Sequence, residues 1–194
     1  MKLYHGSPMG GLQHLEPFVS EHKKPYIYFS SNPVAALLYA VHPVEKPFSW
    51  YPYGFDSNGI VCYCEYYPDA FADIYKGKTG YLYECNLIEN LKKPTNINGV
   101  YACTEAVAVD RMTEIKDIYT ALLEYQNQGL FRVKLYENIT EKEMRMIHED
   151  IKKTITDYEL LSKPACDMSM FYQKHFKDVW DQCETIRHYD MLVD

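Results

Sequence analysis

The chain has 194 residues, of which 47% are hydrophobic and 24% charged, a composition that excludes wholesale disorder. This length holds one domain with a sizeable core, or a core plus an appendage. The formal net charge of −7 argues against general binding to nucleic acid or anionic membranes, because contacts to phosphates need clustered Lys and Arg.

The N-terminal segment MKLYHGSPMG lacks the apolar stretch of a signal peptide, and the chain has no apolar run of about 18 residues. We therefore expect a cytoplasmic protein with no membrane association. Six cysteines without a secretion signal fit reduced thiols. Cys62 and Cys64 form a C-x-C pair on a predicted strand, but a zinc site needs two further ligands, so no metal is predicted.

Short strands dominate the first part of the chain. KLYH (2–5) predicts a strand that GSPMGG ends, and YIYF (26–29) predicts a second strand. SSNP then opens a helix over VAALLYAV (34–41), with Pro33 at its start. A long aromatic loop (41–58) follows, and further strands are predicted over 60–66, 80–87 and 99–109, the last as one strand or two.

Helical periodicity dominates the later part. A helix is predicted over 113–129, a strand over 131–136, and helices over 140–161 and 165–189, the first of these opened by a capping box of Thr140 and Glu143. The pattern predicts the α+β class, with a core at 1–137 and a helical extension at 138–194. The alternative, in which these helices pack fully into a single domain, stays open.

Common nucleotide and hydrolase motifs do not occur. The sequence has no G-x-G-x-x-G after a strand, no P-loop, no G-x-S-x-G and no H-E-x-x-H. Dinucleotide-binding Rossmann, kinase and common hydrolase classes therefore lose their support.

Three other segments contain candidate catalytic or binding residues. The first is Tyr-His-Gly-Ser (4–7) at a strand end, and the second is Tyr-Phe-Ser-Ser (28–31) followed by a helix that carries Tyr39. The third is Thr-Glu-Ala-Val-Ala-Val (104–109), a predicted strand led by Glu105. A histidine, two tyrosines and one acid from separate strands suit a pocket with a stacking wall and a hydroxyl-binding group.

This order resembles the ADP-ribosyltransferase-like family in its H-Y-E class, which includes poly(ADP-ribose) polymerases, diphtheria-toxin-type toxins and small rifamycin-modifying transferases. The resemblance covers roughly residues 2–137. It implies a split β-sheet core, NAD as the substrate, and release of nicotinamide on transfer of ADP-ribose to an acceptor.

The resemblance also implies roles. Glu105 would stabilise the cationic transition state, and His5 would hold a ribose hydroxyl. The Gly6 backbone would bind the nicotinamide amide, and Tyr28 and Tyr39 would stack on the pyridinium ring. Ser30 could steady the glutamate or the ribose, and no metal is required.

Each residue also has a structural interpretation. His5 could be an ordinary strand-end histidine, Tyr39 a core residue and Glu105 a solvated edge residue. Other acids compete with Glu105 for its role: Asp110, Glu114, Glu84 and Glu89.

Three functions follow as expectations. The first is an NAD-dependent ADP-ribosyltransferase whose acceptor is a protein, a small molecule or, less in keeping with the acidic charge, a nucleic acid. The second is a non-catalytic module for NAD, ADP-ribose or a protein on the same fold. The third is a structural or interaction protein whose Tyr-rich loop and C-terminal amphipathic helices form a protein interface, with oligomers through these helices as one form of it.

Overall fold

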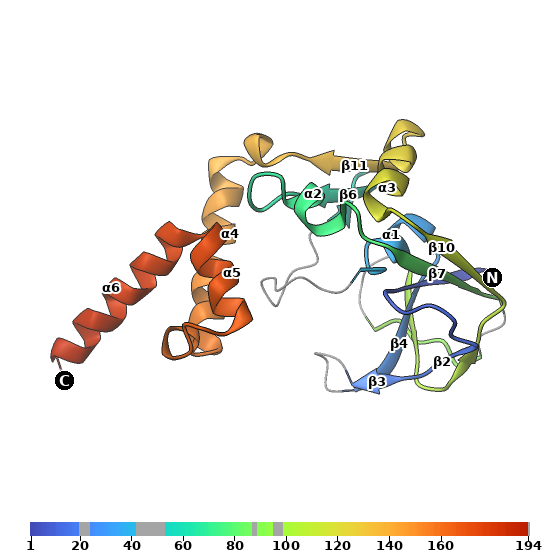
Figure 1. The fold of residues 1–194 in the computed structure, drawn as a ribbon, viewed down its shortest axis with the longest axis horizontal. Helices are drawn as coiled ribbons and strands as arrows, with labels where there is room; N and C mark the ends of the chain where they lie inside the picture. Colours follow the sequence, from blue (N-terminus) through green and yellow to red (C-terminus); the bar gives the residue numbers. More distant parts are fainter. Residues whose placement is uncertain (20–23, 42–52, 87–88, 95–98, 194) are drawn as a thin grey trace. The chain divides into compact units, whose positions relative to one another are not determined.

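The computed structural model describes residues 1–19, 24–41, 53–86, 89–94 and 99–193 (Figure 1). Helices and sheets both occur within these ranges, as predicted for the α+β class, and the elements from α4 (Glu141–Asp157) onward are helical. No helix in the described part of the chain is both long and apolar enough to span a membrane.

Two compact units interleave along the chain. Unit 1 consists of Met1–His42, Phe55–Val61 and Phe71–Arg132. Unit 2 consists of Pro43–Gly54, Cys62–Ala70 and Val133–Asp194. The helical extension predicted from residue 138 lies within the last segment of unit 2. Unit 2 also includes two segments from the region that the sequence assigned to the core.

An antiparallel sheet organises unit 1 (Figure 1). Within the described residues its strand order is β10-β7-β1-β4-β3, with β8 beside β4. These strands are β1 (Leu3–Ser7), β3 (Phe18–Val19), β4 (Pro25–Ser30), β7 (Gly80–Cys85), β8 (Val100–Cys103) and β10 (Arg111–Ile115). A separate ladder pairs β2 (His14–Leu15) with β9 (Val107–Ala108).

One face of the sheet buries an apolar cluster. Alternate residues of a strand point to opposite faces, so Leu3 of β1 and Ile27 and Phe29 of β4 share this face. The buried members of the cluster are Leu3, Leu15, Ile27, Phe29, Tyr83, Cys85, Cys103 and Val107. This face is called the core face below.

Helix α1 (Pro33–Leu37) packs against β1 and β7 on the opposite face. Asn32 caps the helix by accepting a hydrogen bond from the Val34 amide, 2.9 Å away. The helix is shorter than the predicted 34–41, because the amides of Tyr39 and Ala40 bond carbonyls three residues back in a tighter turn. This opposite face is called the α1 face.

The predicted helix over 113–129 is wrong in its first part. Residues 111–115 form β10, opposite β7, and α3 (Ile118–Asn127) starts only after Asp117. The Asp117 side chain accepts hydrogen bonds from the amides of Tyr119 and Thr120, which fixes the helix start. Helix α2 (Ala70–Tyr75) was not predicted at all.

Three further strands pair in the order β11-β6-β5, and the unit boundaries fall within them. They are β5 (Tyr53–Phe55), β6 (Val61–Cys64) and β11 (Phe131–Lys134). Part of the predicted aromatic loop is therefore a strand, and residues 42–52 of that loop lie outside the described residues.

Unit 2 is mainly helical, with two short 3-10 turns. After α4 come α5 (Asp167–His175) and α6 (Lys177–Val193), and the 3-10 turns are η1 (Tyr136–Asn138) and η2 (Leu160–Ser162). The capping box of Thr140 and Glu143 is confirmed. The predicted single helix over 165–189 is wrong, because Phe176 leaves helical geometry and separates α5 from α6.

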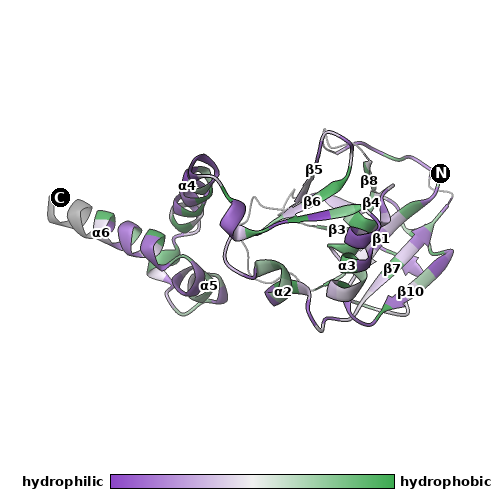
Figure 2. Ribbon diagram, turned by 90° about the horizontal axis from the view of Figure 1, so that it is seen from above, coloured by the Kyte–Doolittle hydropathy of each residue, from purple (hydrophilic) through white to green (hydrophobic). Residues whose placement is uncertain are grey.

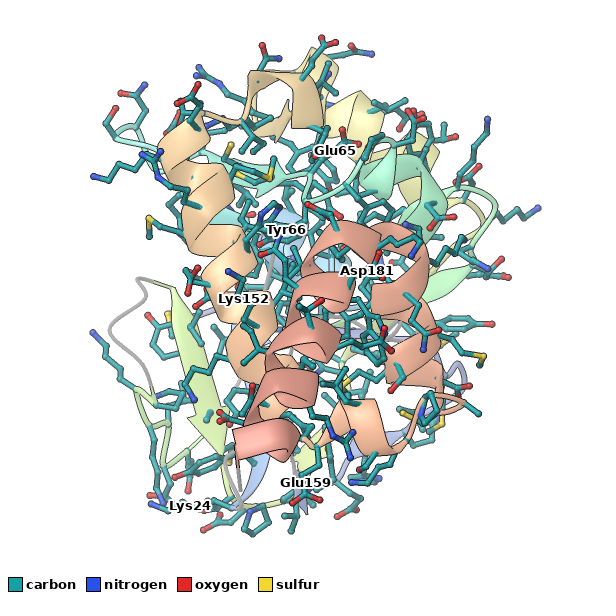
Figure 3. The ribbon with its side chains drawn as sticks, turned by 90° about the vertical axis from the view of Figure 1, so that its left-hand side faces the viewer. Lys24, Glu65, Tyr66, Lys152, Glu159 and Asp181 are labelled. Atoms are coloured by element: carbon teal, nitrogen blue, oxygen red, sulfur yellow. The ribbon has the colours of Figure 1, made fainter. Side chains whose placement is uncertain are left out.

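A core between these helices stabilises unit 2. Figure 2 shows hydrophilic and hydrophobic residues alternating along α4 and α6, as expected of helices with one buried side. The buried members include Ile147, Ile151, Ile155, Leu160, Tyr172, Phe176, Val179 and Trp180. Tyr66 packs against this core and, in the view of Figure 3, is seen between α4 and α6.

Candidate functional site

The sheet of unit 1 opens between β1 and β4. The two strands pair only at Tyr4 and Ser30, whereas β1 pairs with β7 over all five of its residues. From His5 onward β1 and β4 therefore no longer form a ladder. This opening, between residues 5–7 of β1 and 27–29 of β4, is called the split below.

His5 bridges the split. Its Nδ1 lies 2.9 Å from the carbonyl oxygen of Tyr28 on β4. A carbonyl can only accept a hydrogen bond, so Nδ1 carries the proton and donates it. The His5 ring meets Phe29 edge-on at 6.0 Å and lies 6.4 Å from the Tyr83 ring, which places it on the core face.

Burial lowers the pKa of His5, and the hydrogen bond to Tyr28 offsets this only in part. The imidazole is consequently neutral near pH 7. In the neutral tautomer with a proton on Nδ1, Nε2 is a hydrogen-bond acceptor. Nε2 can therefore accept a hydrogen bond from a donor such as a sugar hydroxyl.

The lowered pKa of His5 predicts a pH-dependent stability of unit 1. The unfolded chain takes up a proton near pH 6.5 and the folded chain only at lower pH, so acid favours unfolding. The contribution of neutral His5 to the stability of the folded state is complete above about pH 6.5. It is lost as the pH falls toward the pKa of His5 in the folded chain. In His5→Asn, the protection factors of the β1 and β4 amides, which are corrected for the intrinsic pH dependence of exchange, should fall less between about pH 7 and pH 5 than in the wild type. An equal fall of the protection factors in both proteins would contradict this prediction.

The other aromatic candidates lie on the α1 face. Tyr28 alternates with Phe29 along β4, and its ring meets that of Tyr26 edge-on at 5.8 Å. Tyr39 follows α1, one residue beyond the helix cap, and is half-buried. The structure therefore places His5 on one face of the split and both tyrosines on the α1 face.

Gly6 has a packing role that needs no ligand. A Cβ at Gly6 would lie 2.0 Å from the Ala36 carbonyl oxygen, and one at Gly80 would lie 2.1 Å from that of Ala40. The two glycines therefore allow the backbone of α1 and of the turn after it to lie directly against β1 and β7. The predicted contact between the Gly6 backbone and nicotinamide stays a prediction.

Ser30 is buried at the end of β4, where its Oγ accepts a hydrogen bond from the Asn32 amide at 3.0 Å. The hydroxyl thus stabilises the turn into α1. Its predicted role toward a ribose or the glutamate stays a prediction.

Glu105 lies in a bend after β8, two residues before β9, and not at the head of a strand as predicted. Its side chain is exposed, and its Oε1 accepts a hydrogen bond from Nδ2 of Asn90 at 3.3 Å. Its backbone amide lies 3.5 Å from the Cys103 sulfur. Two local contacts therefore hold the bend that carries this acid.

The strand register places β8, the strand before Glu105, on the far side of β4 from β1. Ser30 pairs with Tyr4 of β1 and also with Val100 of β8, so β1 and β8 lie on opposite edges of β4. Two strand spacings separate β8 from β1 there, roughly 10 Å. The bend containing Glu105 must therefore turn back toward the split for this acid and His5 to act on one substrate.

Two of the competing acids have structural partners. The Glu84 carboxylate pairs with Lys2 at 2.8 Å and with Arg111 at 3.9 Å. Asp110 accepts a hydrogen bond from the Asn86 amide at 2.7 Å. Glu89 and Glu114 are exposed.

Sequence reasoning missed Asn90 and Cys103. Asn90 has a positive φ of 56°, a conformation that Asn tolerates better than most residues. Nothing in the sequence links Asn90 to an acid fifteen positions away, because the contact depends on how two loops meet.

The C-x-C pair lies on β6 as predicted, with both thiols half-buried. Burial, with the neighbouring Cys62, raises the pKa of Cys64 to about 11. Among the residues that the structure describes, no three His, Cys, Asp or Glu side chains gather as ligands of a metal ion. Cys64 is therefore a protonated, partly buried thiol.

No protein-family model, no curated protein and no solved structure matches this chain.

Proposed function

We propose that this protein is an NAD-dependent ADP-ribosyltransferase with a split-sheet core of the ADP-ribosyltransferase-like type in unit 1. The observation that carries the proposal is the split, with His5 hydrogen-bonded across it to the Tyr28 carbonyl. The order of the three sequence segments that resemble the H-Y-E class supports it independently.

In this proposal NAD binds at the split. The nicotinamide end contacts Tyr28 and Tyr39 on the α1 face, where stacking on an aromatic ring favours the pyridinium cation. A ribose hydroxyl donates to Nε2 of His5 on the core face. Contacts to both the nicotinamide ring and the ribose would hold the bond between them in a fixed orientation.

Transfer then breaks the bond between ribose C1′ and the pyridinium nitrogen. Nicotinamide leaves with the electron pair as a neutral molecule, and the ribose ring develops oxocarbenium character. The Glu105 carboxylate stabilises this positive charge. The acceptor attacks C1′ and loses its proton, for which Glu105 is the base in the proposal.

A second function also has a specific observation in its favour. The strand before Glu105 lies two strands away from β1, which suits a module that binds NAD or ADP-ribose without transfer. This module would share the split and the aromatic contacts, and it would show no turnover.

NAD binding is tested by thermal unfolding in millimolar NAD. A ligand that binds only the folded state raises stability by about 2.7 kcal/mol at a concentration of 100 Kd, which shifts the melting temperature by several degrees. We expect this rise in the wild type and its loss in Tyr28→Leu.

The matched control for Tyr28→Leu is Tyr119→Leu. Tyr119 lies on α3 and packs against Phe71 at a ring distance of 5.0 Å. Each variant is compared with its own melt without NAD. A wild-type melt that NAD leaves unchanged, or an equal rise in Tyr28→Leu, would contradict the proposed site.

A further inference from the structure

Asn90 and Glu105 belong to two loops that meet at the edge of unit 1. Asn90 follows β7 along the chain, and Glu105 follows β8. The Asn90 amide nitrogen lies 3.3 Å from Oε1 of Glu105, and an amide nitrogen can only donate. One carboxylate oxygen is therefore oriented by Asn90.

A second contact ties the same two loops together. The Cys103 thiol lies 3.8 Å from the Glu89 carbonyl oxygen, to which it donates, and its sulfur accepts from the Glu105 amide at 3.5 Å. Cys103 is buried in the core cluster and is therefore a fixed point. The bend of Glu105 is thus held through its backbone by Cys103 and through its side chain by Asn90.

The backbone at Asn90 is specialised for this contact. Its φ of 56° is a left-handed conformation that costs most residues about 1 kcal/mol and that Asn, Asp and Gly tolerate. In this conformation the side chain reaches Glu105 in the neighbouring loop. A loop residue whose side chain contacts only solvent would need neither this unusual φ nor a partner such as Glu105.

We propose that Asn90 is the positioning residue of the transfer reaction: it donates to Oε1 of Glu105 and leaves Oε2 to face the reacting ribose. This inference rests on the proposed function. Asn90 acts through Glu105 and does not touch the substrate. Its loss should lower kcat for nicotinamide release and leave KM for NAD nearly unchanged, because binding through His5 and Tyr28 remains.

Two substitutions at Asn90 keep the backbone conformation. Asn90→Gly removes the amide and should lower kcat about 10-fold, as losses of groups that orient a reacting residue commonly do. Asn90→Asp replaces the amide with a carboxylate beside Oε1. Two carboxylates this close repel each other, so the acidic limb of the pH–rate profile should move to higher pH.

The charged and titratable groups around this contact are few among the described residues of the two loops. Beyond Glu105 itself they are Glu89, Lys92, Lys93 and the Cys103 thiol. None of them changes in either variant, so the shift in Asn90→Asp reports the new carboxylate. Asn58→Gly is the control, since Asn58 is an exposed turn residue of unit 1 that belongs to neither loop.

The experiment measures nicotinamide release against pH for the wild type, Asn90→Gly, Asn90→Asp, Asn58→Gly and Glu105→Gln. The inference is supported by a 10-fold loss in Asn90→Gly, a shifted acidic limb in Asn90→Asp and no change in Asn58→Gly. It is overturned, with the proposed function intact, if Glu105→Gln loses turnover and both Asn90 variants match the wild type.

A separate readout needs no NAD. The carboxyl carbon resonance of Glu105, followed by NMR against pH, should have its midpoint at higher pH in Asn90→Asp than in the wild type. If the wild type releases no nicotinamide and NAD leaves its melting temperature unchanged, the proposed function fails and the catalytic role of Asn90 fails with it. The NMR midpoint then shows whether the contact itself exists.

Discussion

Glu105→Gln is expected to lower the rate of nicotinamide release from NAD by about 10²- to 10³-fold. The substitution keeps the shape of the side chain and its ability to accept from Asn90, which lies 3.3 Å away. It removes the negative charge that the proposal sets against the developing oxocarbenium ion. NAD affinity should change by less than about threefold, since Glu105 acts mainly in the transition state.

The control for this prediction is Glu114→Gln. Glu114 is an exposed acid on β10, and it loses the same charge on substitution. Equal rates for Glu105→Gln and the wild type would remove Glu105 from the mechanism. The exposed Glu89 would then be the next acid to test, because Glu84 and Asp110 already serve as structural partners.

Gly6→Ala is expected to destabilise unit 1 by about 3 kcal/mol. The added methyl group would lie 2.0 Å from the Ala36 carbonyl oxygen, and the next neighbours, 3.0 Å away, are also backbone atoms of α1 and the turn that follows it. Backbone cannot move aside as a flexible side chain can. The helix must therefore shift away from β1, which opens the packing on the α1 face.

Gly54→Ala is the control for Gly6→Ala, because a Cβ at Gly54 meets nothing within 4 Å and the residue is exposed. It should change stability by less than about 0.5 kcal/mol. Hydrogen exchange in increasing urea measures both variants, through the unit 1 amides for Gly6→Ala and through the β5 amides for Gly54→Ala. Equal stability of Gly6→Ala and the wild type would contradict the close approach of α1.

The strands that flank the site could be predicted from sequence because their apolar alternation is local. YIYF and GYLYEC are rich in aromatic and β-branched residues and lie in β4 and β7. The capping box at Thr140 is likewise a local pattern, and it was predicted correctly.

The error at residues 113–117 has a tertiary cause. Ile115 continues the apolar spacing of α3, so the helical pattern seemed to begin at Thr113. Pairing with β7 instead holds Thr113 opposite Leu82 and Ile115 opposite Gly80. The start signal that was overlooked is Asp117, whose side chain caps α3.

The candidate site was only partly predictable. The sequence named His5 and Tyr28, and the structure joins them through a backbone carbonyl that no sequence pattern specifies. Their positions on opposite faces follow from strand register. The partner of Glu105 could not be predicted, because Asn90 meets it through a contact between two loops.

The measurement that tests the central claim most directly is the release of nicotinamide from NAD by the purified protein, with Glu105→Gln measured beside it. The account predicts release that is proportional to wild-type protein and that nearly disappears in the variant. Absence of release, together with a melting temperature that NAD leaves unchanged, would contradict both the transferase and the binding module. Absence of release with a raised melting temperature would contradict transfer to water and retain an NAD site in the split.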